Sequence, residues 1–272
     1  MQITTSSFWW KGRSASVNQD SLSLQHVRLG NGSAVLAVVC DGIGSLARGE
    51  EASGIAVRCL TQWFYGECRE LIFERKSKEL ILLALQRQVY QIQELLLKFQ
   101  QKEKIRSGTT MTCLLLIRRR YYLVHIGDGR LYLFRRRKFL PVILWRRVGV
   151  KCLTAEDRDK TGRLTKCLGA ECIDRPFYDT GRIRRGSLFL LGTDGIWYGM
   201  DRNRLGQLFG NVWGRKDPGQ ISGKIPDGKH PGQPGGNVCD IGQLQRRLEM
   251  MAQQSADRGS MDNMAAIAVV TE

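Results

Sequence analysis

The sequence has no apolar run long enough to cross a membrane and no secretory signal. Its longest apolar stretches are Ala34–Cys40, Leu80–Leu85 and Met111–Ile117, far short of the roughly 20 residues that a spanning helix needs. The amino-terminal segment lacks a basic start followed by an apolar core. The sequence therefore predicts a protein without a membrane span, located in the cytoplasm.

Metal-ligand and redox motifs built on cysteine are also missing. The eight cysteines form no C-x-x-C pair, and several, such as Cys40 and Cys113, lie inside apolar runs where a free thiol behaves as a small hydrophobic side chain. We expect them to be reduced and structural. A G-x4-G-K-[ST] phosphate loop is absent as well, so the sequence gives no support to nucleotide hydrolysis.

Acidic residues are outnumbered, with 26 Asp and Glu against 42 Lys and Arg, which gives a formal charge of +16. Such a charge permits binding to an acidic partner. Nucleic acid is not the expected one, because aromatic residues make up only 8% of the chain and no recognition motif is present. Much of the excess lies in Arg118–Arg120, Arg135–Lys138 and Arg146–Arg147, beside strand-like segments, and is interpreted as solvated hairpin ends.

Apolar periodicity predicts a strand-rich chain with two long helices early in the sequence. One helix follows Gly49 and runs to about Glu70, the second runs from about Lys78 to Lys104, and a third is expected over Ile241–Ser255. The predicted strands are Ala34–Cys40, Thr109–Ile117, Tyr121–Ile126, Leu131–Phe134, Ser187–Leu191 and Ala265–Thr271. This order indicates a layered α+β domain.

One segment, residues 211–240, shows no hydrophobic period. It holds four of the six prolines and seven of the 30 glycines, which is typical of a loop. A Gly/Pro/Lys-rich loop of this length is either flexible or a docking surface, and flexibility is favoured. The chain is therefore predicted to be a single domain, residues 1–272, with a flexible loop at 211–240.

Three aspartates stand at the ends of predicted buried strands. Asp41 and Asp194 each follow an apolar strand and precede a glycine, and Asp262 comes just before the last strand. A single Asp-Gly is more often a turn than a ligand. Three carboxylates at converging strand ends would instead repel one another and need a cation. Because the three histidines lie elsewhere, a hard ion such as Mg²⁺ or Mn²⁺ fits better than zinc.

Rival catalytic motifs are weaker. The spacing Cys-x5-Arg occurs at Cys113 with Arg119 and at Cys152 with Arg158, but the first encloses an apolar strand and the second encloses two acids. The run Asp159-Lys160-Thr161-Gly162 is similar to a phosphoaspartate motif, yet no apolar strand delivers its aspartate. We interpret all three as chance matches.

The ordered motifs together resemble the type 2C metal-dependent protein serine/threonine phosphatases, in the short form seen in bacteria. The likeness runs from about Val17 to Val270. Its motifs are Asn18-Gln19-Asp20-Ser21, Asp41-Gly42-Ile43-Gly44, Gly49-Glu50 with Ala52-Ser53, Ser107-Gly108-Thr109-Thr110, Gly127-Asp128-Gly129-Arg130, Leu164-Thr165 with Leu168-Gly169, Thr193-Asp194-Gly195-Ile196 and Asp262-Asn263.

The resemblance implies a four-layer α-β-β-α sandwich and hydrolysis of phosphoserine and phosphothreonine in proteins by a water that bridges two Mn²⁺ or Mg²⁺ ions. Asp41 would bridge the ions, Gly42 would offer its carbonyl oxygen, and Asp194 and Asp262 would complete the first site. Asp20 would hold a metal-bound water, and Asp128 would bind the third ion that some members use. These roles make Asp20, Asp41, Asp194 and Asp262 the catalytic set. Phosphorylated proteins and a serine/threonine kinase would be the partners.

The main departure from the family pattern concerns the arginine that binds phosphate. Ala15 holds its place, and Arg13, two residues further from Asp20, is the candidate replacement. The histidine that some members use as a general acid is Ile43. These departures leave open a second interpretation, a catalytically weak regulatory or binding module with a basic docking surface.

Overall fold

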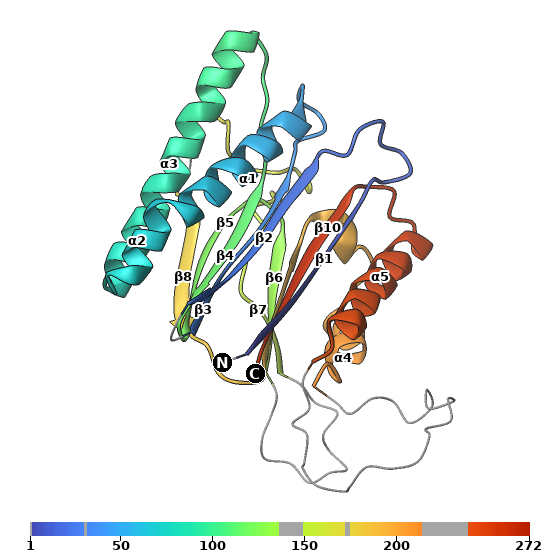
Figure 1. Cartoon of the computed structure of the whole chain (residues 1–272). Helices are drawn as coiled ribbons and strands as arrows, with labels where there is room; N and C mark the ends of the chain where they lie inside the picture. Colours follow the sequence, from blue (N-terminus) through green and yellow to red (C-terminus); the bar gives the residue numbers. More distant parts are fainter. Residues whose placement is uncertain (1, 30–31, 136–148, 172–174, 214–238) are drawn as a thin grey trace, which may run out of the picture.

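The computed structural model describes residues 2–29, 32–135, 149–171, 175–213 and 239–272. In this part of the chain, two antiparallel sheets of five strands lie face to face (Figure 1). Sheet A has the order β1-β10-β9-β6-β7 and sheet B the order β2-β3-β4-β5-β8. The strands of sheet A are β1 (Ile3–Trp10), β6 (Arg130–Arg135), β7 (Gly149–Cys152), β9 (Ser187–Gly192) and β10 (Met264–Thr271). Those of sheet B are β2 (Asp20–Leu29), β3 (Gly32–Asp41), β4 (Met111–Ile117), β5 (Arg120–Ile126) and β8 (Phe177–Arg182).

The layers follow from the two-residue period of the buried strands. On β3, Val35, Ala37 and Val39 belong to the apolar core between the sheets. The alternate residues Leu36 and Val38 belong to the core under the helices. Since successive side chains of a strand point to opposite faces, an apolar run without alternation requires cover on both sides.

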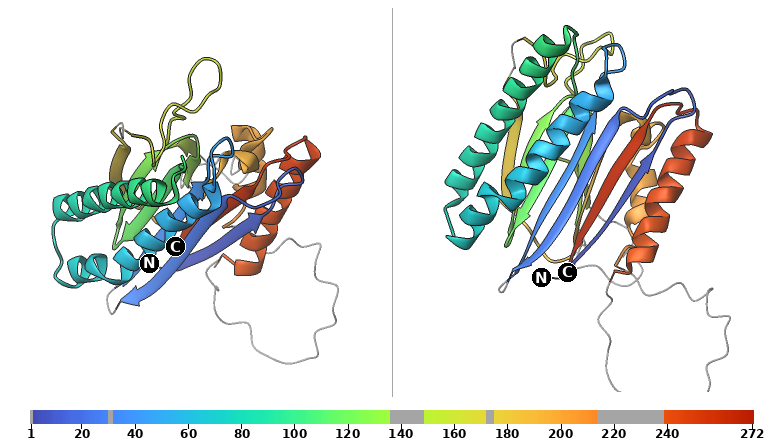
Figure 2. Two further views of the ribbon diagram at one scale, coloured as in Figure 1. Left: turned by 90° about the horizontal axis from the view of Figure 1, so that it is seen from above. Right: turned by 45° about the horizontal axis from the view of Figure 1, so that its top comes forward.

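Helices supply that cover on both outer faces of the sandwich. Figure 2 shows α1, α2 and α3 over sheet B and α5 over sheet A, and α4 packs with α5 in the core of the second face. The bounds are α1 (Gly49–Tyr65), α2 (Glu67–Phe73), α3 (Lys78–Glu103), α4 (Arg202–Phe209) and α5 (Ile241–Asp257), with a short 3-10 helix η2 at Asp194–Trp197. The predicted four-layer sandwich is confirmed.

Several elements were not predicted, because their sequences are short or alternate apolar residues with polar ones. They are β1, β2, β7, β8 and α4. The first predicted helix is in fact two, because Gly66 has φ −91° and ψ −109°, outside the helical region, and separates α1 from α2. Most of the predicted loop, residues 214–238, lies outside the described residues.

Membrane-spanning helices and disulfides are both absent from the described residues. None of the helices there is both long enough and apolar enough to cross a membrane. The seven cysteines in the same ranges are all free thiols. Burial raises the pKa of the Cys68 thiol to about 12, and Cys40 and Cys113 are wholly buried, so these thiols are structural.

Candidate metal centre

Five aspartates lie close together at one end of the sandwich, and α1 begins at the same end (Figure 1). Asp20 starts β2 and is the register partner of Asp41 at the end of β3. Asp194 follows β9, Asp262 precedes β10, and Asp128 lies in the turn between β5 and β6. Because neighbouring strands are antiparallel, the end of one meets the start of the next. Both sheets therefore deliver carboxylates to a common edge, as the strand-end pattern predicts.

Hydrogen bonds across the two sheets fix Asp20 in this cluster. The Thr193 hydroxyl donates to Asp20 Oδ2 at 2.7 Å and accepts from the Ala265 backbone N–H at 3.0 Å. Trp9 Nε1 donates to the Asp20 carbonyl oxygen at 3.0 Å. Asp20 is 3% exposed. It belongs to β2 of sheet B, and these hydrogen bonds connect it to β1, to the end of β9 and to β10 of sheet A.

Asn263 connects the loop that carries Asp262 to the start of β2. Its side-chain oxygen accepts from the Gln19 backbone N–H at 2.8 Å, and its own N–H donates to Asp262 Oδ1 at 2.8 Å. The Gln19 carbonyl oxygen accepts from Ser53 Oγ at 2.7 Å, on the first turn of α1. These bonds place the Asp-Asn pair against the motif that contains Asp20.

A close backbone approach explains the glycine after Asp41. A Cβ atom on Gly42 would lie 2.3 Å from the Gly49 carbonyl oxygen, and one on Gly49 would lie 2.9 Å from the Gly42 carbonyl carbon. The chain leaving β3 therefore runs directly against the start of α1. Only glycine fits at this contact. The Gly42 carbonyl group therefore stays next to Asp41 in the turn that leaves β3.

The shared location makes the carboxyls hard to ionise. Burial raises the pKa of Asp20 to about 8, and Asp194 and Asp262 add repulsion. Burial, followed by repulsion from Asp20 and Asp194, raises the pKa of Asp41 well above its ordinary value. Without a compensating cation, Asp20 and Asp41 are therefore harder to ionise than ordinary aspartates.

The two carboxyls at the margins of the cluster behave similarly. The pKa of Asp194 is raised by burial and then by Asp128, while Arg158 opposes the shift. The pKa of Asp262, which is exposed on one side, is raised by the partial burial of its carboxyl and by Asp194. The positive charge of Arg158 therefore does not offset the burial and mutual repulsion of the carboxyls at this edge.

Three oxygens of the cluster are buried without a hydrogen-bond partner among the described residues. They are Oδ1 of Asp20, Asp128 and Asp194. A buried carboxylate oxygen without a partner is costly, and a set of oxygen donors of this kind suits Mg²⁺ or Mn²⁺. The residues therefore fit the cation that the sequence predicts.

The carboxyls are nevertheless not yet arranged around one ion. Within the described ranges, no three His, Cys, Asp or Glu side chains form a group that could hold a metal as they stand. One interaction contributes to this: Arg158 pairs with Asp194 Oδ2 and so engages an oxygen that a metal ion would need.

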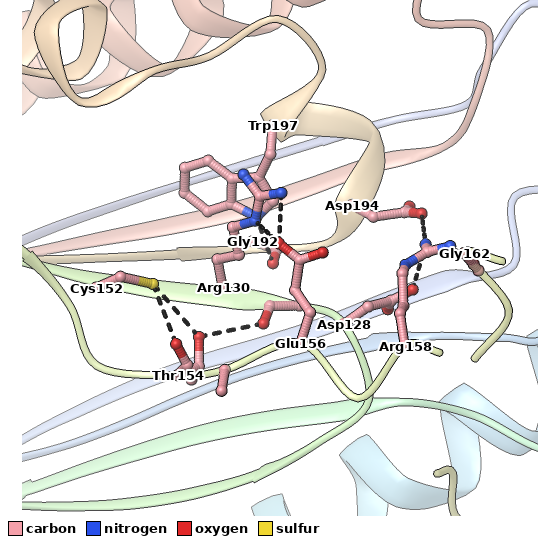
Figure 3. Close-up of polar contacts among 12 residues, drawn as sticks. Asp128, Arg130, Cys152, Thr154, Glu156, Arg158, Gly162, Gly192, Asp194 and Trp197 are labelled. Atoms are coloured by element: carbon pink, nitrogen blue, oxygen red, sulfur yellow. Dashed lines mark hydrogen bonds and ion pairs between the residues drawn. The ribbon is translucent and has the colours of Figure 1, made fainter. Parts of the chain in front are cut away.

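Arg158 is the residue that sequence reasoning missed. Figure 3 shows its guanidinium between Asp128 and Asp194. Nη2 pairs with Asp128 Oδ2 and lies 2.7 Å from Asp194 Oδ2, and Nη1 donates to the Gly162 carbonyl oxygen at 2.7 Å. An internal cation is thus paired with Asp128, the residue that would bind a third ion.

The segment that carries Arg158 is tied to the turn that carries Asp128. The Gly127 N–H donates to Asp157 Oδ2 at 2.9 Å, and the Asp157 N–H donates to the Gly127 carbonyl oxygen at 2.8 Å. Buried His125 adds a third link, because its Nε2 lies 3.0 Å from the carbonyl oxygens of both Gly127 and Ala155. Burial lowers the pKa of His125, so the ring is neutral and serves as a structural donor.

Two other residues singled out from the sequence, Arg13 and Asp159, lie outside the aspartate cluster. Arg13 is exposed on the loop after β1, which packs against the Asp262 loop through a 2.8 Å bond from Ser14 Oγ to the Met261 carbonyl oxygen. Asp159 of the apparent phosphoaspartate motif has its Oδ1 engaged by the Thr161 hydroxyl at 2.6 Å and the Thr161 N–H at 2.8 Å. Asp159 is therefore a turn residue.

Removing the internal cation should strengthen metal binding. An Arg158→Gln variant leaves Asp128 and Asp194 repelling each other, so we expect Mn²⁺ to bind about tenfold more tightly, as measured by isothermal titration calorimetry. The matched control is Arg130→Gln, because Arg130 pairs with Glu156 outside the cluster, and it should leave the affinity unchanged. Weaker Mn²⁺ binding by Arg158→Gln alone would show that Arg158 supports the site.

Comparison with known proteins agrees with this architecture. The sequence profile of the family described as Protein phosphatase 2C matches residues 12–225. Among curated proteins, none matches the sequence. The serine/threonine phosphatase Stp1 from Staphylococcus aureus has a similar structure, with a TM-score of 0.73 at 18% identity over 100% of this chain and 96% of that one. The Mycobacterium tuberculosis serine/threonine phosphatase PstP/Ppp gives 0.69 at 19% identity over 99% of both chains.

Fold and profile together define the class: a protein phosphatase built on a four-layer sandwich. This chain belongs to the Protein phosphatase 2C family. The family relationship confirms the resemblance drawn from the ordered motifs, whereas the role of each aspartate stays a prediction.

Proposed function

We propose that this chain hydrolyses phosphoserine and phosphothreonine in proteins and does so with bound Mn²⁺ or Mg²⁺. The observation that carries the proposal is the set of buried, unpartnered carboxylate oxygens on Asp20, Asp128 and Asp194, in a cluster whose pKa values are raised by burial and by mutual repulsion. In a related structure, the catalytic domain of PstP is in complex with two manganese ions; it gives a TM-score of 0.67 at 19% identity.

Asp41, the Gly42 carbonyl, Asp194 and Asp262 would hold the principal ions, Asp20 would hold a water, and Asp128 would serve a third ion. The cations, when bound, would acidify water and neutralise charge on a phosphoryl group. The protein's own contribution is to fix the carboxylates at strand ends, where the register of β2 with β3 aligns Asp20 with Asp41. Rigid strand ends position such groups better than free loops do.

The phosphoryl group also needs a positively charged side chain near the cluster. Arg13 is the predicted one, and its loop contacts the backbone next to Asp262 closely: a Cβ on Gly12 would lie 2.4 Å from the Asp262 carbonyl oxygen. This contact supports Arg13 as the residue that replaces the family's arginine, whose position Ala15 occupies. We infer that Arg13 reaches the phosphoryl group from this loop. Phosphorylated proteins, and a serine/threonine kinase acting on the same substrates in the cytoplasm, are the partners that this activity implies.

The test is hydrolysis of a phosphothreonine peptide by an Asp194→Asn variant. We expect kcat/KM in Mn²⁺ to fall by at least about a thousandfold, a loss of about 4 kcal/mol of transition-state stabilisation. The control is Asp257→Asn, which makes the same chemical change at an exposed residue of α5 that is hydrogen-bonded to Gln253 and should keep full activity. Activity of Asp194→Asn that persists in EDTA would refute the proposal.

A second candidate, a regulatory or binding module with little turnover, is favoured by one observation. The Arg158 guanidinium pairs with two of the predicted metal aspartates, and such pairing competes with cations. This candidate predicts that Mn²⁺ binds weakly and that turnover is low in the wild type. Saturating Mn²⁺ with rapid peptide hydrolysis would exclude it.

A further inference from the structure

A basic groove lies at the end of sheet B opposite to the aspartate cluster. Three segments distant in sequence form it: the α2–α3 connection, the β4–β5 turn and the chain at the end of β8. Figure 1 shows the α2–α3 connection at the far end of the helical layer from the start of α1. The groove has a volume of about 780 Å³, within the range of ligand-binding clefts.

Eight cationic side chains and no acidic ones line this groove. They are Arg75, Lys76, Lys78, Arg118, Arg119, Arg120, Arg182 and Arg184. Lys76 has an ion pair with Glu74 at 3.0 Å, and Lys78 has one with Glu79 at 3.4 Å. None of the six arginines has an ion pair with a carboxylate in the described part of the chain.

The sheet register adds repulsion inside the groove. Arg120 on β5 is the direct partner of Arg182 on β8. Like charges placed opposite each other across two strands are destabilising. Ile183 N donates to the Arg119 carbonyl oxygen at 2.8 Å, which keeps the two arginine-rich segments together just beyond the sheet. A solvated hairpin end would explain the arginines of the β4–β5 turn alone. It does not explain why three basic segments line the same groove.

An anion would relieve this repulsion, and guanidinium groups bind carboxylates and phosphates through paired hydrogen bonds. The shape and chemistry of the groove narrow the choice of partner. Its aromatic lining residue, Tyr122, is 2% exposed, so it offers no face on which a nucleic-acid base could stack. The cations line a concavity, which a flat lipid surface would not enter.

Apolar side chains also line the groove or lie beside it. The buried side chains of Ile81, Ile117 and Ile183 line it. Beside it, Phe73 at the end of α2 and Leu80 at the start of α3 are 64% and 46% exposed. We propose that the groove docks an acidic segment of a partner protein that also carries apolar side chains. Such docking would be separate from the aspartate cluster, so it does not depend on the chain's being an active phosphatase.

Fluorescence anisotropy with a labelled oligo-glutamate peptide tests the proposal at low ionic strength. A triple variant, Arg119→Glu with Arg182→Glu and Arg184→Glu, is expected to weaken binding by about tenfold or more. The control, Arg58→Glu with Lys98→Glu and Arg246→Glu, makes the same change in net charge at exposed positions outside the groove. It should weaken binding by less than about twofold, the effect of net charge alone.

Three results would overturn the proposal: no binding by the wild type, equal loss in both triple variants, or tighter groove-dependent binding of a single-stranded oligonucleotide or of phosphatidylserine vesicles. Circular dichroism and thermal melting confirm that both variants are folded. Hydrolysis of p-nitrophenyl phosphate, a substrate too small to reach the groove from the aspartate cluster, should be the same in the groove variant and the wild type. A failure of docking is thereby distinguished from a failure of the proposed phosphatase activity.

Discussion

An Asp41→Asn variant is expected to be more stable than the wild type in metal-free buffer at pH 8 and to lose nearly all stabilisation by Mn²⁺. The pKa of Asp41 is raised well above its ordinary value of 3.8 by burial and by its neighbours. A carboxyl with a raised pKa in the folded state contributes stability at low pH that is lost as the pH rises through the folded pKa. The amide has no proton to lose, so it avoids this penalty.

Thermal unfolding measures both effects. We expect the metal-free variant to gain about 1–3 kcal/mol at pH 8, the usual cost of leaving a buried polar group uncompensated. That gain is a rise in Tm of about 2–4 °C per kcal/mol for a chain of this size. The difference should shrink as the pH falls below the unfolded pKa of about 3.9, where folded and unfolded carboxyls are both protonated. In the wild type, Mn²⁺ at about 100 times its Kd should add about 2.7 kcal/mol.

The opposite result would be informative. If Asp41→Asn is less stable than the wild type at pH 8 in EDTA, the carboxylate is compensated by some other group and the cluster does not need a cation. If Mn²⁺ raises the Tm of the variant as much as that of the wild type, the ion binds elsewhere. An Asp257→Asn variant should respond to Mn²⁺ as the wild type does.

A Gly42→Ala substitution should destabilise the protein by about 3 kcal/mol, the upper end of the usual cost of overpacking, because overpacking against rigid backbone cannot be relieved by side-chain movement. The added Cβ would lie 2.3 Å from the Gly49 carbonyl oxygen. Separation of the two segments would shift Asp41 and the Gly42 carbonyl, so Mn²⁺ affinity should fall as well. Denaturant unfolding and calorimetric titration measure the two losses.

Gly206→Ala provides the matched control for Gly42→Ala. Gly206 is inside α4, and a Cβ there would have no atom within 4 Å. The substitution is expected to be neutral or to stabilise the protein by up to about 1 kcal/mol, because alanine restricts the unfolded chain. Equal stability of Gly42→Ala and the wild type would show that the contact between the end of β3 and the start of α1 adapts, and that Gly42 is not fixed by packing.

The sequence was most informative where a buried strand ends in a polar residue. The apolar runs before Asp41 and Asp194 predict strands, and each aspartate is in place at the strand end. The pairing of Asp20 with Asp41 was harder to predict from residues alone, because β2 alternates polar and apolar side chains and its register is set by contact with β3. The ordered family motifs, rather than periodicity, identified Asp20 and Asp128.

Features produced by long-range contacts could not be predicted. Arg158 lies beyond β7 and reaches the cluster because Asp157 and His125 fix its segment against the β5–β6 turn. The basic groove depends in the same way on the register of β5 with β8, which places Arg120 opposite Arg182. A linear sequence shows each arginine run separately, and only the fold brings the runs to one cavity.

If the aspartate cluster is a metal centre at which phosphorylated protein side chains are hydrolysed, phosphate release must depend on the metal ion. The measurement is the release of phosphate from a phosphothreonine peptide by the full chain as Mn²⁺ is titrated into protein freed of metal with EDTA. We expect no release before Mn²⁺ is added, and release that rises with Mn²⁺ and then saturates. Release that is the same in EDTA and in Mn²⁺, or none at any Mn²⁺ concentration by a folded protein, would show that the cluster is not such a centre.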